Sequence, residues 1–191
     1  MREDELLLFP LHSVLFPGGA LRLRIFEPRY TELVRCCTRE QRPFGVCLIL
    51  DGSEAGSPAT PAAFGTTARI DDFYTLPDGL LGISASGERR FHVRRTRVRD
   101  NGLIVAEVEA LEAPPTEPVR PEHGLLVTLL DHLLEQLGGP HAQAPRPCFD
   151  QADWVGFRLA ELLPLRPDER QGLLQCADPH ERLDRIVRSL R

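Results

Sequence analysis

Apolar residues follow two different periods along the chain, and the change falls close to residue 113. Before it, apolar positions alternate with polar ones or form short unbroken runs, and both patterns are typical of β-strands. One predicted strand alternates between aliphatic and arginine side chains: Leu21, Arg22, Leu23, Arg24 and Ile25. Another, at residues 44–50, is an unbroken apolar run, which indicates a strand buried on both faces. Residues 5–112 are therefore predicted to be mostly strands.

Turn residues divide this half into shorter pieces. Segments 65–76 and 80–86 flank Pro77-Asp78-Gly79, a turn in which we expect Gly79 to adopt a positive φ. Gly87 is expected to interrupt the chain before a further strand at 90–99. The sequence therefore predicts a hairpin followed by a separate strand.

The last hairpin of this half joins strand 90–99 to a strand at 103–111. A two-residue turn at Asn101-Gly102 would set Arg95 opposite Val108 and Arg97 opposite Ala106, which places arginines on the apolar face. A three-residue loop with Gly102 in the left-handed conformation keeps similar residues together. It pairs Val98 with Ile104, Thr96 with Ala106 and Arg95 with Glu107. We predict the three-residue loop, because a register slip moves every side chain to the other face.

One helix and one long loop interrupt the predicted strands. Pro28 suits the first position of a helix. The apolar residues after it recur at helical spacing: Tyr30, Leu33, Val34 and Cys37. Residues 51–64 are rich in Gly, Pro, Ser and Ala, which predicts a long surface loop. Loops of this length are often functional.

A proline-rich connector at residues 113–121 separates the two halves, with four prolines in nine residues. Proline lacks a backbone donor and favours an extended, stiff chain. Beyond the connector the apolar period becomes helical. Four helices are predicted from their start and stop residues. The first contains leucines from 125 to 137 and ends at Gly138, and the second follows Asp150 and ends before Pro164. The third begins at Pro167, and the last follows the cap at Asp178-Pro179.

Four stretches of the sequence occur in the order found in one known family. They are Phe9-Pro10-Leu11 with Leu15-Phe16-Pro17-Gly18, residues 65–70 with 76–79, residues 87–91, and residues 106–109. In this order they resemble the Lon substrate-binding domain, the N-terminal module of Lon-type ATP-dependent proteases, which also occurs as a free-standing protein. Residues 24–30 resemble the free-standing members more closely than the protease version.

The resemblance implies a fold and a division of the chain. The fold class is α+β: an N-terminal PUA-like, mostly antiparallel β-barrel with one inserted helix, followed by a C-terminal helical bundle. We expect the barrel at residues 1–112, the connector at 113–121 and the helical subdomain at 122–191. Three segments of the last region look like the helical bundle of Lon N-terminal regions: 159–165, 169–174 and 182–183.

The chain contains no lysine, since all 23 basic residues are arginine. A P-loop ATPase needs a lysine on the phosphates, and the Lon protease site is a Ser-Lys dyad, so these residues can form neither site. The stretch at 82–87, with Ser84 and Ser86, lacks the second glycine and the following helix of a nucleophile elbow. The six histidines lack metal-ligand spacing. We therefore expect a protein that is not an enzyme and binds no cofactor or metal.

Cysteine content and the N-terminal residues indicate a cytoplasmic protein. Five cysteines, an odd number with no C-x-x-C spacing, are expected to be reduced thiols. The acidic start at residues 1–5 does not resemble a secretory signal, and no apolar stretch is long enough to span a membrane. Cys37 falls on the apolar helix face, so a core position is favoured over a reactive thiol there and beside it at Cys36.

Charge separates two possible ligands, polypeptide and RNA. A net charge of −5 disfavours a nucleic-acid binder, whereas PUA-like barrels elsewhere bind RNA. Six arginines that could meet RNA cluster in eleven residues: Arg89, Arg90, Arg94, Arg95, Arg97 and Arg99. Glu107 opposite Arg95, and aromatic residues at only 6% of the chain, favour an internally paired face over a base-stacking surface.

These observations predict a non-catalytic module that binds exposed polypeptide or a protein partner, related to proteolysis or quality control. RNA binding is the alternative. An extended peptide would dock in a groove between barrel and helices. The candidate groove residues are Arg22, Arg24, Glu27, Arg89 and Arg90, with the predicted loop at 51–64 at the edge of the groove.

Overall fold

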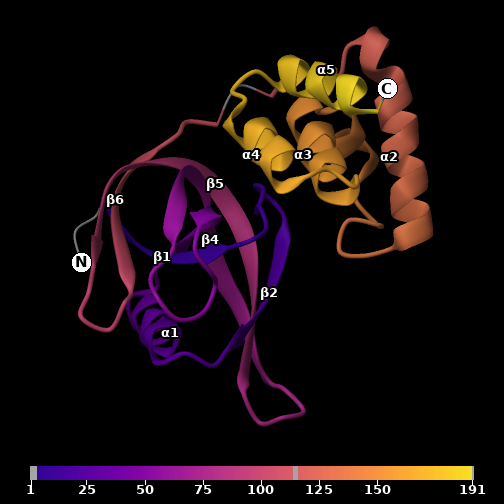
Figure 1. The fold of residues 1–191 in the computed structure, drawn as a ribbon. Coiled ribbons are helices and arrows are strands. Elements are labelled where there is room, and N and C mark those ends of the chain that lie inside the picture. The colour runs from indigo at the N-terminus through magenta and orange to yellow at the C-terminus, as the bar shows by residue number, and fades with distance from the viewer. Residues whose placement is uncertain (1–3, 114–115, 191) are drawn as a thin grey trace. The chain divides into compact units, whose positions relative to one another are not determined.

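The computed structural model describes residues 4–113 and 116–190, and the chain divides into two compact units. The first unit, Met1–Ala113, contains a six-stranded sheet and one α-helix, and the second, Pro114–Arg191, is helical (Figure 1). This arrangement confirms a mixed α+β fold. No helix in the described part of the chain is both long and apolar enough to cross a membrane.

One mixed sheet holds all the strands of the first unit. In chain order these are β1 (Glu5–Leu11), β2 (Ala20–Ile25), β3 (Phe44–Asp51), β4 (Thr60–Thr75), β5 (Leu81–Val98) and β6 (Ile104–Ala110). Their order in the sheet is β2-β5-β4-β3-β1-β6, and β6 also pairs with β5. Every pairing is antiparallel except that of β1 with β3. The pairings therefore form a circuit through β5, β4, β3, β1 and β6, and β2 lies outside it.

The predicted register of the last hairpin is confirmed. β5 and β6 pair Val98 with Ile104, Thr96 with Ala106 and Arg95 with Glu107. Gly102 has φ 82°, and its N–H donates to the carbonyl of Arg99 at 2.8 Å. Hydrophobic matching therefore selected the correct loop length, since the two-residue turn would have moved arginines onto the buried face.

The predicted interruption at Gly87 is wrong, because β5 runs without a break from Leu81 to Val98. A Cβ at position 87 would lie 2.3 Å from the carbonyl oxygen of Phe16. Gly87 instead exchanges hydrogen bonds of 2.8 Å with the chain before β2, accepting from Gly18 N–H and donating to the Gly19 carbonyl. The glycine therefore marks a place where another backbone comes close to a continuous strand.

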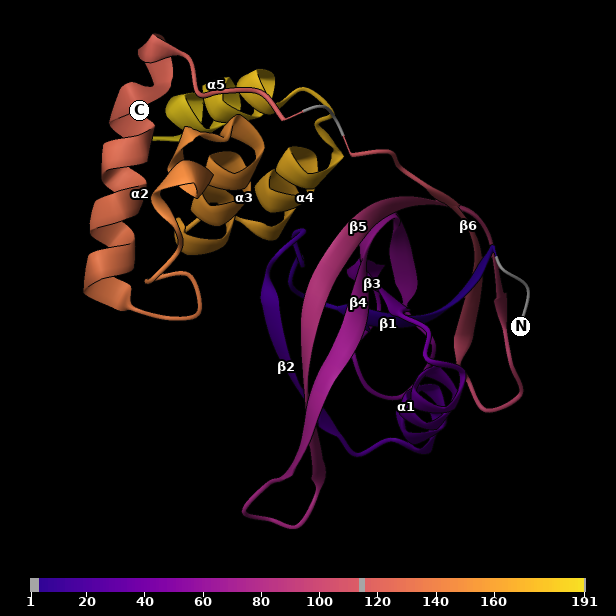
Figure 2. The same ribbon diagram turned by 180° about the vertical axis from the view of Figure 1, so that it is seen from behind.

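The predicted loop at 51–64 is too long. β3 ends at Asp51 and β4 begins at Thr60, so the loop covers only residues 52–59. Asp51 pairs with Thr60 and Ile49 with Pro61, and the register shifts between these pairs. A bulge of this kind accommodates a proline inside a sheet. Beyond the far end of β4, its hairpin with β5 extends away from the rest of the sheet (Figure 2).

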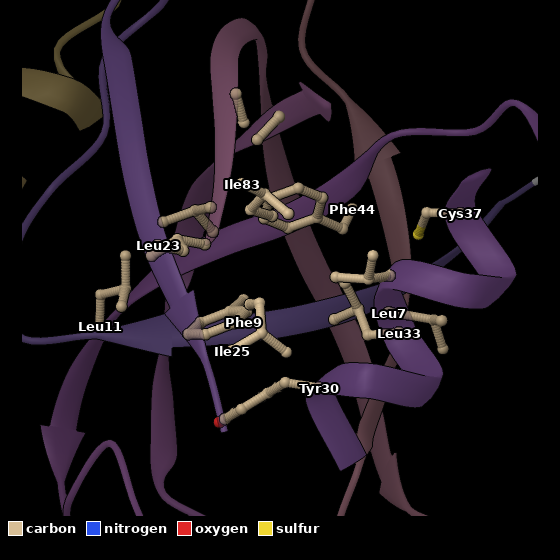
Figure 3. Packing of buried hydrophobic residues seen from close by; sticks show 14 of the residues in the cluster. Leu7, Phe9, Leu11, Leu23, Ile25, Tyr30, Leu33, Cys37, Phe44 and Ile83 are labelled. Carbon is tan, nitrogen blue, oxygen red and sulfur yellow. The ribbon is translucent and has the colours of Figure 1, made fainter. Parts of the chain in front are cut away.

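The only described α-helix of the first unit, α1 (Pro28–Glu40), covers the core of the sheet. Pro28 occupies its first turn, and the predicted face of Tyr30, Leu33, Val34 and Cys37 is buried. Figure 3 shows Tyr30, Leu33 and Cys37 on this helix beside side chains from β1, β2, β3 and β5. β3 is buried from Phe44 to Ile49, as its apolar run predicts, but the last residue of that run, Leu50, is exposed.

The second unit contains four α-helices and two short 3₁₀ helices in its described residues. They are η1 (Pro121–His123), α2 (Gly124–Leu137), η2 (Arg146–Asp150), α3 (Ala152–Leu162), α4 (Pro167–Gln175) and α5 (Pro179–Ser189). The predicted caps at Gly138 and Asp178 are confirmed: Gly138 has φ 67°, and Asp178 accepts from the N–H groups of His180 and Glu181. Of the predicted leucine stripe, Leu126, Leu130 and Leu134 are buried, whereas Leu125 and Leu137 at its ends are exposed.

Asp150 does not open the second predicted helix. It ends η2, and α3 begins at Ala152 with Gln151 extended before it. The cause is the connector: Pro118 forms a β-bridge with Gln151, and Ala152 N–H donates to the Glu117 carbonyl at 2.9 Å. This pairing holds Gln151 extended and delays the helix. Pro114 and Pro115 of the predicted connector lie outside the described residues.

A buried arginine stabilises the interior of the second unit. The Arg182 side chain is fully buried and lies over the ring of Phe157 at 4.0 Å. It donates to the carbonyls of Leu173 and Cys176 and pairs with Asp153 at 2.5 Å. These acceptors replace the hydrogen bonds to water that the guanidinium loses on burial.

Candidate functional site

The outer edge of β2 is unpaired. In the described residues β2 pairs only with β5, so its other edge has no strand beside it. Such an edge presents backbone N–H and C=O groups that can pair with another chain. Along β2, Arg22 and Arg24 are exposed while Leu23 and Ile25 are buried. The strand therefore presents its arginines to solvent and has one edge that pairs with no described strand.

A cavity of about 320 Å³, here called the β2 cavity, lies beside this strand. Its apolar walls come from β1, β2 and α1: Phe9, Leu11, Leu21, Leu23, Phe26 and Tyr30. Its polar walls come from β2, from the chain after β1, from the residue before α1 and from the loop at 52–59: Arg22, Arg24, Ser13, Glu27 and Glu54. An apolar hollow with a few polar groups is the usual form of a ligand pocket. Its position next to the open β2 edge makes it the candidate site.

Two stacked aromatic residues form part of the wall of this cavity. The rings of Phe9 and Tyr30 stack with centroids 3.9 Å apart, and Figure 3 shows Tyr30 below the side chains of Phe9 and Ile25. Burial raises the pKa of Tyr30 to about 12, so its hydroxyl stays protonated and donates to the Glu54 carbonyl at 3.4 Å. Phe26 differs from both, because it is 57% exposed at the end of β2.

Arg29 holds three segments around the β2 cavity. Its buried guanidinium pairs with Glu27 at 3.1 Å and donates to the carbonyls of Glu54 and Gly102. These contacts connect the start of α1, the loop at 52–59 and the β5–β6 hairpin. Glu27 also accepts from Gly56 N–H at 3.4 Å. The cavity wall is therefore fixed by one buried ion pair and its hydrogen bonds.

Three of the five predicted groove residues come together. Arg22, Arg24 and Glu27 all line the β2 cavity, together with Glu54 from the predicted loop. Arg24 pairs with Asp78 at 2.5 Å, and Glu27 is engaged by Arg29. The structure does not bring Arg89 and Arg90 to this cavity. Both lie on β5, where Arg89 is exposed and Arg90 is buried. The cavity itself lies within the first unit.

The arginine-rich part of β5 is largely paired with acids of the same unit. Arg94 pairs with Glu109 at 2.9 Å, Arg97 with Glu5 at 3.0 Å and Arg99 with Glu32 at 2.7 Å. Arg95 lies opposite Glu107 in the register, but within the described residues their side chains form no ion pair. The interpretation of an internally paired face therefore holds for three arginines, with different partners from the one predicted.

Two buried cysteines are unreactive, and the described residues contain no cluster of metal ligands. Burial raises the pKa of both Cys37 and Cys47 to about 12, which keeps these thiols protonated and unreactive. Ser86 lies inside β5, with its hydroxyl donating to Asp71. Within residues 4–113 and 116–190 no three His, Cys, Asp or Glu side chains lie close enough to hold a metal ion.

Comparison with known proteins identifies the family. The family model of the ATP-dependent protease La (LON) substrate-binding domain matches residues 5–191, so the chain belongs to this family. A Lon N-terminal domain protein from Xanthomonas campestris has a similar structure, with 50% identity, a TM-score of 0.81 and 96% of each chain covered. The N-terminal domain of a Mycobacterium avium complex Lon protease shares the fold, at 16% identity, 96% coverage of each chain and a TM-score of 0.67.

Several curated relatives are Lon proteases. Lon proteases of Phenylobacterium zucineum and Paraburkholderia phytofirmans are 24% and 27% identical over 96% and 97% of this chain. The chain spans about a quarter of their length, 24% in each case. The chain therefore matches only part of each protease, and the family model assigns the chain to the substrate-binding domain, in agreement with the resemblance in the sequence.

Two parts of the site have little signal in the sequence. Arg29 lies in the stretch 24–30 but carries no pattern that predicts a buried cation. Phe26 follows a strand in which aliphatic and arginine residues alternate, and the alternation predicts a polar, exposed residue at its position. An aromatic residue at an exposed position was therefore the one feature of the sequence that could have indicated a binding contact. Neither residue was among the predicted groove residues.

Proposed function

We propose that this chain is a non-catalytic module that binds exposed polypeptide in proteolysis or quality control. The observation that carries the proposal is the open edge of β2 beside an apolar cavity. Membership of a substrate-binding family supports it. The first unit is, in this proposal, a PUA-like β-barrel, since its strand pairings return on themselves. The connector at 113–121 leads to the helical subdomain at 122–191.

Binding would occur by addition of a strand. An extended segment placed along β2 would form main-chain hydrogen bonds with the unpaired edge, which requires no particular sequence. Its side chains would alternate, so every second one would face the β2 cavity. Phe26 would contact an apolar side chain at the end of this track. The cytoplasm suits such a protein, because all five cysteines are free.

Fluorescence anisotropy of a labelled, unstructured peptide with one leucine or phenylalanine tests this site. Phe26→Ala should weaken binding by about tenfold, as expected when an aromatic contact residue is truncated. Phe73→Ala is the matched control, since Phe73 is 44% exposed and lines a different cavity of about 470 Å³ near Gln41 and Arg69. It should change affinity less than about twofold.

Two results would overturn the proposal. One is the absence of binding by the wild-type protein to any unstructured peptide. The other is a loss of binding in Phe73→Ala with none in Phe26→Ala, which would move the site to the second cavity. RNA binding is the weaker alternative, because Arg94, Arg97 and Arg99 already have acidic partners.

A further inference from the structure

Phe26 joins two hollows of the first unit. It lines the β2 cavity and also a cavity of about 550 Å³, here called the α1 cavity, whose other residues are Pro28, Thr31, Glu32, Arg35 and Asn101. The ring is 57% exposed between them. A segment that follows β2 and contacts Phe26 would therefore continue toward the α1 cavity.

The acidic residues of these two cavities already have partners. Glu27 pairs with Arg29, and Glu32 pairs with Arg99 at 2.7 Å and accepts from the Asn101 side chain. Glu54 accepts from His12 N–H at 2.8 Å. Two of the three carboxylates are thus neutralised by arginine, and the third is held by a backbone donor. Among the described residues Glu54 alone of the three keeps a negative charge without an ion pair, because a backbone N–H does not neutralise a carboxylate.

Two basic residues remain free, one in each cavity. Among the described residues, Arg22 of the β2 cavity and Arg35 of the α1 cavity have neither an ion pair nor a side-chain hydrogen bond, and both are exposed. Arg24, by contrast, pairs with Asp78. The cations available to a ligand are therefore Arg22 and Arg35, one in each of the two cavities that Phe26 lines, and they outnumber the single unpaired carboxylate of Glu54.

We propose that this site selects polypeptide segments in which one apolar side chain is flanked on both sides by Asp or Glu. The apolar side chain contacts Phe26, and the flanking carboxylates pair with Arg22 and Arg35. Arg22 precedes Phe26 by four residues, so the first acid lies about 13 Å, or about four extended residues, from the apolar anchor. This inference rests on the proposed function and specifies its substrate class.

The test uses three labelled peptides of equal length with the same central leucine and with Asp, Asn or Lys at the flanking positions. The wild-type protein should bind the Asp peptide about three- to tenfold more tightly than the Asn peptide at low salt, with the Lys peptide weakest. The preference should shrink in high salt because these charges are exposed. The double variant Arg22→Gln, Arg35→Gln should bind the Asp and Asn peptides equally.

A second double variant, Arg89→Gln with Arg95→Gln, is the control. It also removes two exposed arginines of the first unit that have no ion pair among the described residues. Its preference for the Asp peptide should equal that of the wild type. Melting temperatures of both variants should match the wild type, since none of the four side chains is buried.

The outcomes separate this inference from the proposed function. Equal binding of all three peptides by the wild type overturns the charge preference and leaves peptide binding intact, whereas failure to bind any of them overturns the proposed function. Loss of the preference only in the Arg89/Arg95 variant would place the cations elsewhere and overturn the inference. So would an oligouridylate that displaces the Asp peptide at lower concentration, because RNA would then be the preferred polyanion.

Discussion

Gly87→Ala tests how the start of β2 is held against β5. The added Cβ would lie 2.3 Å from the Phe16 carbonyl oxygen, and real Cβ atoms do not approach a backbone atom so closely. Residues 16–19 must therefore move away from β5. This movement breaks the two hydrogen bonds of 2.8 Å that join Gly87 to Gly18 and Gly19. Two lost backbone hydrogen bonds correspond to about 1–3 kcal/mol in the free energy of unfolding.

Urea unfolding monitored by far-UV circular dichroism measures this loss. The single tryptophan, Trp154, lies in α3 of the second unit, so its fluorescence reports the helical unit separately. Gly172→Ala in α4 is the control, because a Cβ there meets no atom within 4 Å. It should stabilise the protein by up to about 1 kcal/mol, as helix propensity predicts. If Gly87→Ala unfolds within about 0.5 kcal/mol of the wild type, the close crossing of the two backbones is refuted.

Three further predictions concern the loop, pH and the arginine-rich strand. Arg29→Met removes the buried contacts to Glu27 and Glu54, which hold the loop at 52–59. A glutamate-specific protease should therefore cut this variant at Glu54 faster than it cuts the control variant Arg35→Met. Equal rates would contradict the role of Arg29. Burial raises the pKa of Glu161 to about 7 despite its pairing with Arg158. Between about pH 4.5 and pH 7 the native state therefore keeps a proton that the unfolded chain has lost, so the free energy of unfolding falls as pH rises through this range. Relative to the wild type, the free energy of unfolding of Glu161→Gln should rise by about 1–2 kcal/mol between pH 5 and pH 8. A difference that does not depend on pH would contradict this. Replacing Arg94, Arg95 and Arg97 with Gln should leave peptide affinity within about twofold; wild-type nanomolar RNA binding that this variant loses would favour the RNA alternative.

Local patterns predicted the elements that depend on nearby residues. The Asp178 cap, the α1 face and the β5–β6 register follow from short-range spacing, because side-chain period and turn chemistry are local properties. The β2 strand was predicted from its alternation of leucine and arginine. Arg22, Arg24 and Glu27 came from the same stretch of sequence and do line one cavity.

Features that depend on distant contacts were not predictable in this way. Gly87 was expected to break a strand, but its role is set by Phe16, which lies 71 residues earlier in the chain. The first residues of β4 were predicted to belong to a loop because their composition is typical of loops. They form a strand because they pair with β3. Arg89 and Arg90 were predicted groove residues, but they lie on β5 and do not line the β2 cavity.

Amide hydrogen exchange of residues 20–25, measured by NMR with and without the Asp-flanked peptide, tests the central claim most directly. Strand addition predicts that the β2 amides not bonded to β5 become protected when peptide binds, while those already bonded to β5 change little. Alternate N–H groups of a peptide strand point toward β2 and away from it. N-methylation of those that point toward β2 should abolish this protection, and N-methylation of the others should preserve it. Protection at residues 69–73 and 88 with β2 unchanged would contradict the account, because the peptide would then occupy the second cavity rather than the open strand edge.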